Sequence, residues 1–235
     1  MTDPIPTGCT AVDDLLGDGF ERGVATQVYG PPAAGKTNIV LSAAVEVAAD
    51  GGSALFIDTE GLSVERMEQL AAARVDRPDA AAASVDDLAS RLILSSAHTF
   101  EEQEEAVRDA EGLADAVELI VLDSATGFYR LERTEGDGGE TLRAVGRQLA
   151  HLISLARQHD LAVAFTNQVF SDPEGERARA LGGHTLDHWS GAIFRVERFR
   201  GGNRRATLEK HRSRPAGDSA RFRITGDGLA TTDER

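Results

Sequence analysis

The sequence predicts an α/β fold: a mostly parallel central sheet flanked by helices, with an antiparallel β extension near the C-terminus. Before residue 170, apolar segments of strand length alternate with amphipathic segments of helix length, the pattern of a doubly wound sheet. The segment 118–123 is almost continuously apolar, as is typical of a parallel strand covered on both faces. After residue 190, strand-like segments follow one another without helices, so we expect an antiparallel edge.

The individual elements follow from apolar periodicity and from breaks at Gly, Pro and polar residues. Before residue 170 we expect helices at 36–49, 64–74, 100–114 and 141–159, and strands at 24–29, 53–58, 91–95, 118–123 and 161–166. After residue 190 we expect strands at 192–199, 206–211 and 220–225, with a turn at 201–203. The Ala- and Asp-rich segment 71–90 is expected to be a surface excursion. We expect one domain, 1–235.

Composition excludes several classes of protein. Apolar residues make up 41% of the 235, enough for one sizeable core and too many for a disordered chain. The single cysteine, Cys9, excludes an intramolecular disulfide framework and fits a reducing compartment. The N-terminus shows no signal-peptide pattern, and no apolar run approaches the roughly 20 residues that span a bilayer. We therefore expect a cytoplasmic protein with no membrane contact.

Charge is distributed unevenly along the chain. The net charge is −14, and 23 of the 25 basic residues are Arg, a usage that resembles halophilic proteins. The two lysines are Lys36 and Lys210. Residues 1–170 carry 29 acidic and 12 basic residues, whereas 171–235 carry 10 acidic and 13 basic residues. The basic C-terminal segment either binds an anion or forms a solvated face paired with the acidic remainder.

A phosphate-binding loop stands between the first expected strand and the first expected helix. The sequence satisfies G-x-x-x-x-G-K-[ST] with Gly30, Pro31, Pro32, Ala33, Ala34, Gly35, Lys36 and Thr37, and Asn38 follows. Such a loop turns its backbone N–H groups toward phosphates, and the following helix adds its positive end. Lys36 is expected to reach the β- and γ-phosphates, and the Thr37 hydroxyl to bind Mg²⁺. These residues predict that ATP with Mg²⁺ is the cofactor.

Three further polar residues follow expected strands at the same edge of the sheet, where ligands of α/β proteins bind. Asp123 ends a strand and is expected to hold Mg²⁺, although Asp after a strand is often only a turn residue. Glu60 can polarise the attacking water as a general base, and Gln168 can sense the γ-phosphate. From position alone, residues such as Glu60 and Gln168 are as often ordinary loop residues as catalytic ones. The loops 126–140 and 171–183 leave this edge.

At these residues the sequence resembles the RecA-type recombinases, including the short archaeal paralogues of the RadA recombinase. The similar segments are Phe56 to Gly61 (FIDTEG), Leu122 to Thr126 (LDSAT) with Tyr129-Arg130, Thr166 to Val169 (TNQV), and Gly182-Gly183 with His188. The resemblance runs from about residue 5 to residue 230. It implies a RecA-like P-loop ATPase core, and it implies that 126–140 and 171–183 contain the two DNA-binding loops.

The resemblance also implies roles for single residues. Lys36 and Thr37 would bind the phosphates and Mg²⁺, Asp123 the metal, and Glu60 the attacking water. Gln168 would couple the nucleotide state to the loop 171–183. His188 matches a position that faces the nucleotide at a subunit boundary. Lys210 matches a basic strand near the γ-phosphate, although it can also be an ordinary surface lysine.

Departures from the family shape the expected function. We expect the core to begin almost at Met1, without the family's N-terminal helix-hairpin-helix domain, and no Phe of the sequence begins the Phe-x-x-Ala segment that joins filament subunits in the family. Ala33 and Ala34 replace residues that are often Gly and a small hydroxyl residue, and Ala33 restricts φ where Gly would not. The loop arginines stand among acidic residues, so we expect a weak grip on phosphates. The candidate DNA-binding residues are Arg130, Arg133, Arg177, Arg179, Arg204 and Arg205.

We therefore expect an ATP- and DNA-binding accessory protein of homologous recombination and DNA repair, acting at the nucleoid. It would be a weak Mg²⁺-dependent ATPase with little or no strand exchange of its own, and would assist or regulate a RadA-type recombinase. We expect the protein to bind single-stranded or branched DNA weakly and with salt dependence. The sequence does not decide whether the protein associates with itself. The alternative is a regulatory RecA-like ATPase of the circadian-clock or signalling type that acts on proteins without DNA. A small-molecule kinase fits less well, because no lid or acceptor pocket is visible in the sequence.

Overall fold

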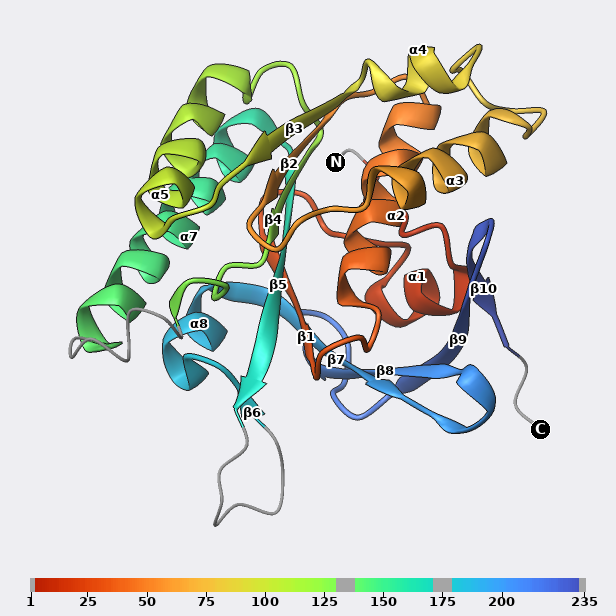
Figure 1. Cartoon of the computed structure of the whole chain (residues 1–235). Helices are drawn as coiled ribbons and strands as arrows, with labels where there is room; N and C mark the ends of the chain where they lie inside the picture. Colours follow the sequence, from red (N-terminus) through yellow and green to blue (C-terminus); the bar gives the residue numbers. More distant parts are fainter. Residues whose placement is uncertain (1–2, 130–137, 171–178, 233–235) are drawn as a thin grey trace.

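The structure is a computed structural model that describes residues 3–129, 138–170 and 179–232 (Figure 1). Its helices are α1 (Thr10–Leu16), α2 (Lys36–Ala49), α3 (Val64–Val75), α4 (Val85–Ala89), α5 (Phe100–Asp109), α7 (Gly138–His159) and α8 (Gly183–Trp189), with 3-10 turns η1 (Ala110–Leu113) and η3 (Arg200–Gly202). Its strands are β1 (Ala25–Gly30), β2 (Ala54–Asp58), β3 (Leu92–Ser96), β4 (Leu119–Asp123), β5 (Ala162–Phe170), β6 (Arg179–Ala180), β7 (Ser190–Arg198), β8 (Arg204–Lys210), β9 (Ser219–Thr225) and β10 (Gly228–Thr231).

The strands form one sheet in the order β10-β9-β8-β7-β1-β5-β4-β2-β3, and β6 pairs with β5. From β3 to β7 the neighbours are parallel, whereas β7, β8, β9 and β10 pair in antiparallel fashion. This confirms the predicted mostly parallel sheet with an antiparallel extension. The expectation that the strand at 192–199 already belongs to the antiparallel edge is wrong. Helix α8 precedes β7, and β7 starts beside the first residue of β1, so the two strands run parallel.

Helices cover both faces of the parallel strands (Figure 1). Helices α1 to α4 lie on one face, and α5, α7 and α8 lie on the other. Every residue of β1, β2 and β4 is buried, which explains the continuously apolar run in β4. No helix in the described ranges combines the length and apolar character needed to cross a bilayer.

The segment 71–90 is more than the expected surface excursion. It contains the end of α3 and the short helix α4, whose Leu88 is fully buried in the core beneath α2 and α3. Burying a leucine contributes roughly 2 kcal/mol, enough to fix a five-residue helix that has little stability alone. One apolar residue in five gives too weak a periodicity to predict such an element from sequence.

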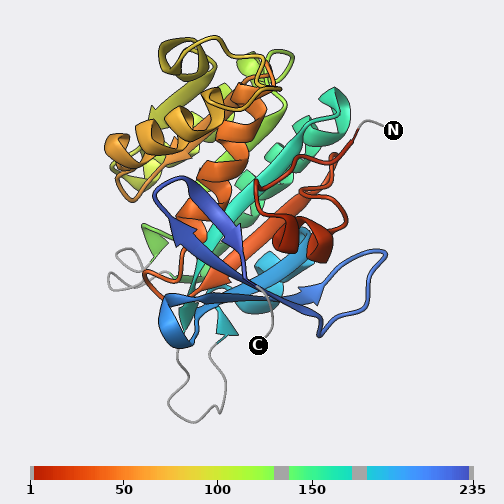
Figure 2. The ribbon, with the colours of Figure 1, turned by 90° about the vertical axis from the view of Figure 1, so that its right-hand side faces the viewer.

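The antiparallel extension, β8 to β10, packs beside α1 (Figure 2). Side chains of β9 alternate between its two faces. Phe222 is fully buried against the core that includes α1 and α2, while Arg221 and Arg223 point to the other face. The extension therefore has an apolar inner face and an arginine-bearing outer face.

Candidate nucleotide site at the carboxyl edge of the parallel strands

The phosphate-binding loop connects the last residue of β1, Gly30, to the first residue of α2, Lys36. Both glycines of the motif are required by their surroundings. A Cβ on Gly30 would collide with the carbonyl oxygen of Val196 in β7. Gly35 has φ +110°, and a Cβ there would stand 2.7 Å from Cδ1 of Ile224. The loop is therefore held between β7 and the C-terminal extension.

Ala33 adopts the left-handed conformation, with φ +57°. This conformation costs an L-residue with a Cβ roughly 1–2 kcal/mol compared with the right-handed one. The carbonyl oxygen of Ala33 accepts a hydrogen bond of 3.2 Å from Nε of Arg198 at the end of β7. Ala33, whose φ is more restricted than that of a glycine, is therefore held in place by a side chain from β7.

Lys36 is buried at the base of the loop, with 7% of its surface exposed. Its ammonium group donates to the carbonyl oxygens of Gly30 at 3.1 Å and Pro31 at 3.3 Å. Burial lowers the pKa of Lys36, and the negative charges of Glu60 and Asp123 oppose that effect. In the described part of the chain the hydrogen-bond partners of this buried cation are carbonyl groups, so it is well suited to an added anionic partner such as a phosphate.

Asp123 is 2% exposed at the end of β4 and faces the start of α2. Burial raises its pKa to about 6, while hydrogen bonds from the hydroxyls of Thr166 and Thr37 favour the carboxylate. The contact with Thr37 brings together the two residues that the sequence predicts as Mg²⁺ ligands. An oxygen pair of this kind is the chemistry that Mg²⁺ prefers.

Glu60 and Gln168, assigned from two different strand ends, are in direct contact. Oε1 of Glu60 accepts hydrogen bonds from Nε2 of Gln168 at 2.9 Å and from Oγ of Ser124 at 2.9 Å. The Asp58 carboxylate holds the turn that carries Glu60, accepting from the backbone N–H groups of Gly61 at 3.0 Å and of residue 62 at 2.6 Å. The ends of β2, β4 and β5 thus meet at one carboxylate.

Asn167 is a residue that the sequence analysis missed. Its Oδ1 accepts a 2.8 Å hydrogen bond from Thr126, and its Nδ2 donates at 2.8 Å to the carbonyl oxygen of Leu181. Thr126 begins the segment 126–140, and Leu181 lies at the end of 171–183, so one buried amide ties the bases of the two expected loops. The sequence feature that could have indicated Asn167 is its place beside Gln168 in the TNQV segment.

Arg66 is a second missed residue. Its Nε donates to Oδ1 of Asn38 at 2.8 Å, and its Nη1 donates to the carbonyl oxygen of Gly226 at 2.9 Å. Asn38, predicted as a nucleotide-binding residue, thus already accepts a hydrogen bond within the protein. The bond to Gly226 joins α3 to the turn between β9 and β10. Helical periodicity shows Arg66 only as a polar surface position, so its partners could not be predicted.

His188 and Lys210 lie away from the chain's own phosphate loop. His188 is close to the start of β7, which pairs with the first residue of β1 rather than its last. The ammonium group of Lys210 donates to the carbonyl oxygen of Asp187 at 2.7 Å on the α8 face of the sheet, whereas α2 covers the other face. If His188 and Lys210 contact a nucleotide, it is one bound by a neighbouring subunit. The nucleotide-binding role of each stays a prediction.

The candidate DNA-binding arginines fall into two groups. Arg130, Arg133 and Arg177 lie outside the described residues, and Arg179 is described only through its backbone in β6. Arg204 and Arg205, consecutive on β8, face opposite sides of the sheet. Arg205 pairs with Glu197, whereas a Cβ on Gly35 would lie 3.8 Å from Nε of Arg204. Burial, and then the charge of Arg198, lower the pKa of Arg204.

Known proteins share this architecture. The sequence pattern of the Rad51 family matches residues 3–232. The chain is 58% identical to the DNA repair and recombination protein RadB of Halobacterium salinarum over 228 residues, which cover 96% of this chain and 94% of that one. It is 45% identical to RadB of Methanoculleus marisnigri, with 98% and 99% of the two chains covered. A crystal structure of a RadB recombinase superposes with a TM-score of 0.81 at 34% identity, covering 97% of this chain and 100% of that one.

Proposed function

The chain belongs to the Rad51 family, and on that premise we propose that it is a RadB-type protein that binds ATP with Mg²⁺, binds DNA and assists a RadA-type recombinase. The named relatives are DNA repair and recombination proteins, which favours this function over a clock-type switch. The single observation that supports the ATPase assignment is the convergence of Glu60, Ser124 and Gln168 from three strand ends beside the phosphate loop.

Each residue of the site has a chemical task in this proposal. Lys36 balances phosphate charge, and the oxygens of Thr37 and Asp123 hold the metal ion. When bound, Mg²⁺ neutralises charge that develops on the phosphate oxygens. Glu60 accepts the proton of the attacking water, and Gln168 transmits the state of the site to the segment 171–183 through β5.

The Glu60 carboxylate keeps one oxygen available for the attacking water. Oε1 accepts from Ser124 and Gln168, whereas no protein group in the described ranges donates to Oε2. A carboxylate accepts hydrogen bonds at both oxygens, so Oε2 is the atom that would orient the water and take its proton. The two bonds to Oε1 hold the carboxylate in position for that task.

Two variants separate nucleotide binding from hydrolysis. Lys36→Ala should lose the ATP-dependent rise in Tm, and Glu60→Gln should keep that rise but lose hydrolysis by about 10²-fold or more. Glu68→Gln, an exposed change on α3, is the matched control and should behave as wild type. The readouts are thermal unfolding and phosphate release, each with and without single-stranded DNA.

An unchanged ATP-induced rise in Lys36→Ala would show that the phosphate site is misassigned. A wild-type rate well above that of a recombinase, strongly stimulated by single-stranded DNA, would contradict the accessory role.

A further inference from the structure

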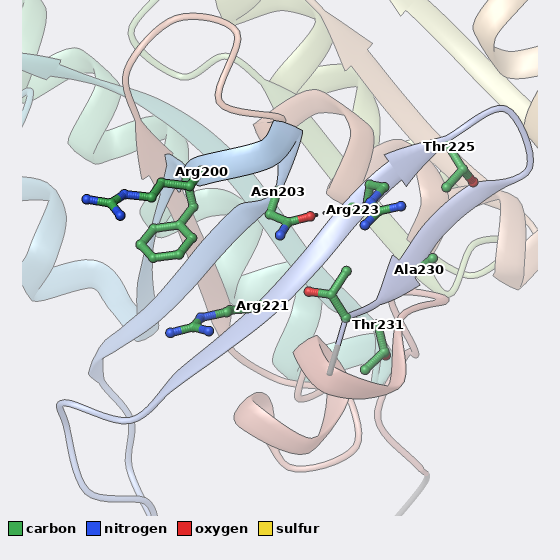
Figure 3. A pocket seen from close by; sticks show the side chains of 9 residues that line it. Arg200, Asn203, Arg221, Arg223, Thr225, Ala230 and Thr231 are labelled. Atoms are coloured by element: carbon green, nitrogen blue, oxygen red, sulfur yellow. Dashed lines mark hydrogen bonds between the residues drawn. The ribbon is translucent and has the colours of Figure 1, made fainter. Parts of the chain in front are cut away.

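A pocket lies on the outer face of the antiparallel extension (Figure 3). The phosphate loop contacts the opposite face, through Ile224 and Arg204. Its volume is about 820 Å³, and it lies between β9, β10 and the turn that joins β7 to β8. Three arginines line it, together with an aromatic ring, an amide and hydroxyl groups, among them Arg200, Arg221, Arg223, Phe199, Asn203 and Thr232. We refer to this surface as the arginine pocket.

Neighbouring groups orient two of the three arginines. The guanidinium of Arg221 lies 4.9 Å from the centroid of the Phe199 ring, which Arg205 also approaches at 5.4 Å. Nε of Arg223 donates a 3.3 Å hydrogen bond to Oδ1 of Asn203, drawn in Figure 3. Contacts with a ring and a neutral amide hold these side chains without neutralising their charge.

Among the described residues, the arginine pocket carries positive charge without a carboxylate in its lining, although the chain has 39 Asp and Glu residues. Arg22 and Arg74 elsewhere pair with glutamates, and Arg205, which also approaches the Phe199 ring, pairs with Glu197. The three pocket arginines have no such partner in the described ranges. Like charges held together in this way favour binding of an anion.

The geometry of the donors favours a chain of anions over a single ion. Arg221 and Arg223 stand two residues apart on one face of β9, so their backbones are about 7 Å apart, and Arg200 adds a third positive charge. One hydroxyl extends the set of donors: Oγ1 of Thr232 is buried with no partner in the described part of the chain, whereas the hydroxyls of Thr225 and Thr231 are already bonded to protein groups. Arg, Thr and Asn side chains are the usual donors to nucleic-acid phosphates.

We propose that the arginine pocket binds the phosphate backbone of single-stranded nucleic acid. The inference rests on the proposed DNA binding and gives it a location outside the two expected loops. Phosphates recur along every nucleic-acid strand whatever its sequence, so several donors are engaged together, whereas an acidic protein segment must carry its carboxylates at matching positions. Because the donors contact phosphates rather than base edges, binding through the pocket is independent of sequence.

The test compares two double variants that change net charge equally. Arg221→Gln with Arg223→Gln removes two pocket charges, and Arg108→Gln with Arg143→Gln removes two exposed charges on α5 and α7. Affinity for a fluorescent oligothymidylate is measured by anisotropy at several salt concentrations. The pocket variant should lose about 25-fold in affinity at 0.1 M salt, and its salt slope should fall by about 1.4. The control pair should stay near wild type.

The ATP-induced rise in Tm should be unchanged in both double variants, which shows that they fold. Equal DNA affinity and slope in the pocket variant and wild type would overturn the inference while leaving DNA binding intact. Absence of DNA binding by wild type would instead overturn the proposed DNA binding itself, and the inference with it. Unchanged DNA binding with loss of RadA-type recombinase binding would assign the pocket to a carboxylate-bearing protein and also overturn the inference.

Discussion

The carboxyl edge of the parallel strands and the antiparallel extension handle charge in opposite ways. At the parallel edge Lys36 and Asp123 are buried: Lys36 donates to carbonyl groups of its own loop, and Asp123 accepts from Thr166 of the neighbouring strand β5. On the extension, Arg221 and Arg223 lie on a solvent-facing surface, where Arg221 contacts the Phe199 ring and Arg223 donates to Asn203. Buried, bonded charges have fixed positions and suit one small ligand, whereas a row of arginines that pairs with no carboxylate in the described ranges suits a long anion.

Arginine side chains of α3 join the two regions along a seam between α2, α3 and the extension. Arg74 forms a buried ion pair with Glu46 of α2, and its Nη1 also donates to the carbonyl oxygen of Asp227 at 2.8 Å. Arg66 makes a similar bond to the carbonyl oxygen of Gly226, and Arg198 of β7 bonds the phosphate loop itself. The extension is therefore fixed beside the nucleotide site by α3, and each contact can be broken separately.

The largest effect is expected from breaking the buried pair. Arg74→Met leaves the Glu46 carboxylate, 3% exposed, with Arg77 as its remaining ion-pair partner in the described ranges, and should cost about 3–5 kcal/mol in the free energy of unfolding. Arg77→Met is the control, because this partly exposed partner of Glu46 should cost about 1 kcal/mol. Urea unfolding measures both. A smaller cost for Arg74→Met than for Arg77→Met would show that the seam does not hold the extension.

The next effect concerns pH. Asp13 on α1 accepts hydrogen bonds of 2.7 Å from the backbone N–H and the hydroxyl of Thr7, while burial and the charge of Glu46 raise its pKa to about 6. Because the folded pKa exceeds the unfolded one, the contribution to stability is present below about pH 4 and is lost as pH rises through 6. Between pH 4 and pH 7, wild type should lose about 1–3 kcal/mol relative to Asp13→Asn.

Unfolding at a series of pH values checks this, with Asp14→Asn, an exposed neighbour, as control. If the free energy of unfolding of wild type and of Asp13→Asn changed equally with pH, the pKa of Asp13 would not be raised by folding.

The smallest effect is expected at the phosphate loop. Arg198→Gln removes the support of the strained Ala33 and should weaken ATP binding about threefold to tenfold, the worth of one hydrogen bond. In an Ala33→Gly background the same change should have less effect, because Gly adopts a positive φ without strain. ATP titration of the four proteins gives the coupling. Equal losses in both backgrounds would mean that Arg198 does not act through Ala33.

Sequence reasoning located the parallel edge well because its signals are local. The phosphate-loop motif predicts Lys36 at a helix start, and residues that end parallel strands, such as Glu60 and Gln168, must share an edge. Their direct hydrogen bond to one another could not be predicted, because it depends on strand order, which a single sequence does not determine.

The extension was predicted less completely. Alternation along a strand separates Arg204 from Arg205, but only the packed structure shows which of them faces the phosphate loop. The contacts of Asn167 and Arg66 join segments far apart in sequence, and a polar residue carries no mark of a distant partner. The parallel direction of β7 was missed because α8 is too short to give a clear periodicity.

The division of tasks between the two regions is tested most directly by measuring the ATP-induced rise in Tm and oligothymidylate affinity for two variants. Lys36→Ala should lose the rise in Tm and keep nucleotide-free DNA affinity within about twofold, because the pocket arginines lie on the face of the extension opposite to the phosphate loop and share no partner with Lys36 in the described ranges. Arg221→Gln with Arg223→Gln should keep the rise and lose DNA affinity. Loss of both properties in either variant, or of neither, would contradict the assignment of nucleotide to the parallel edge and nucleic acid to the extension.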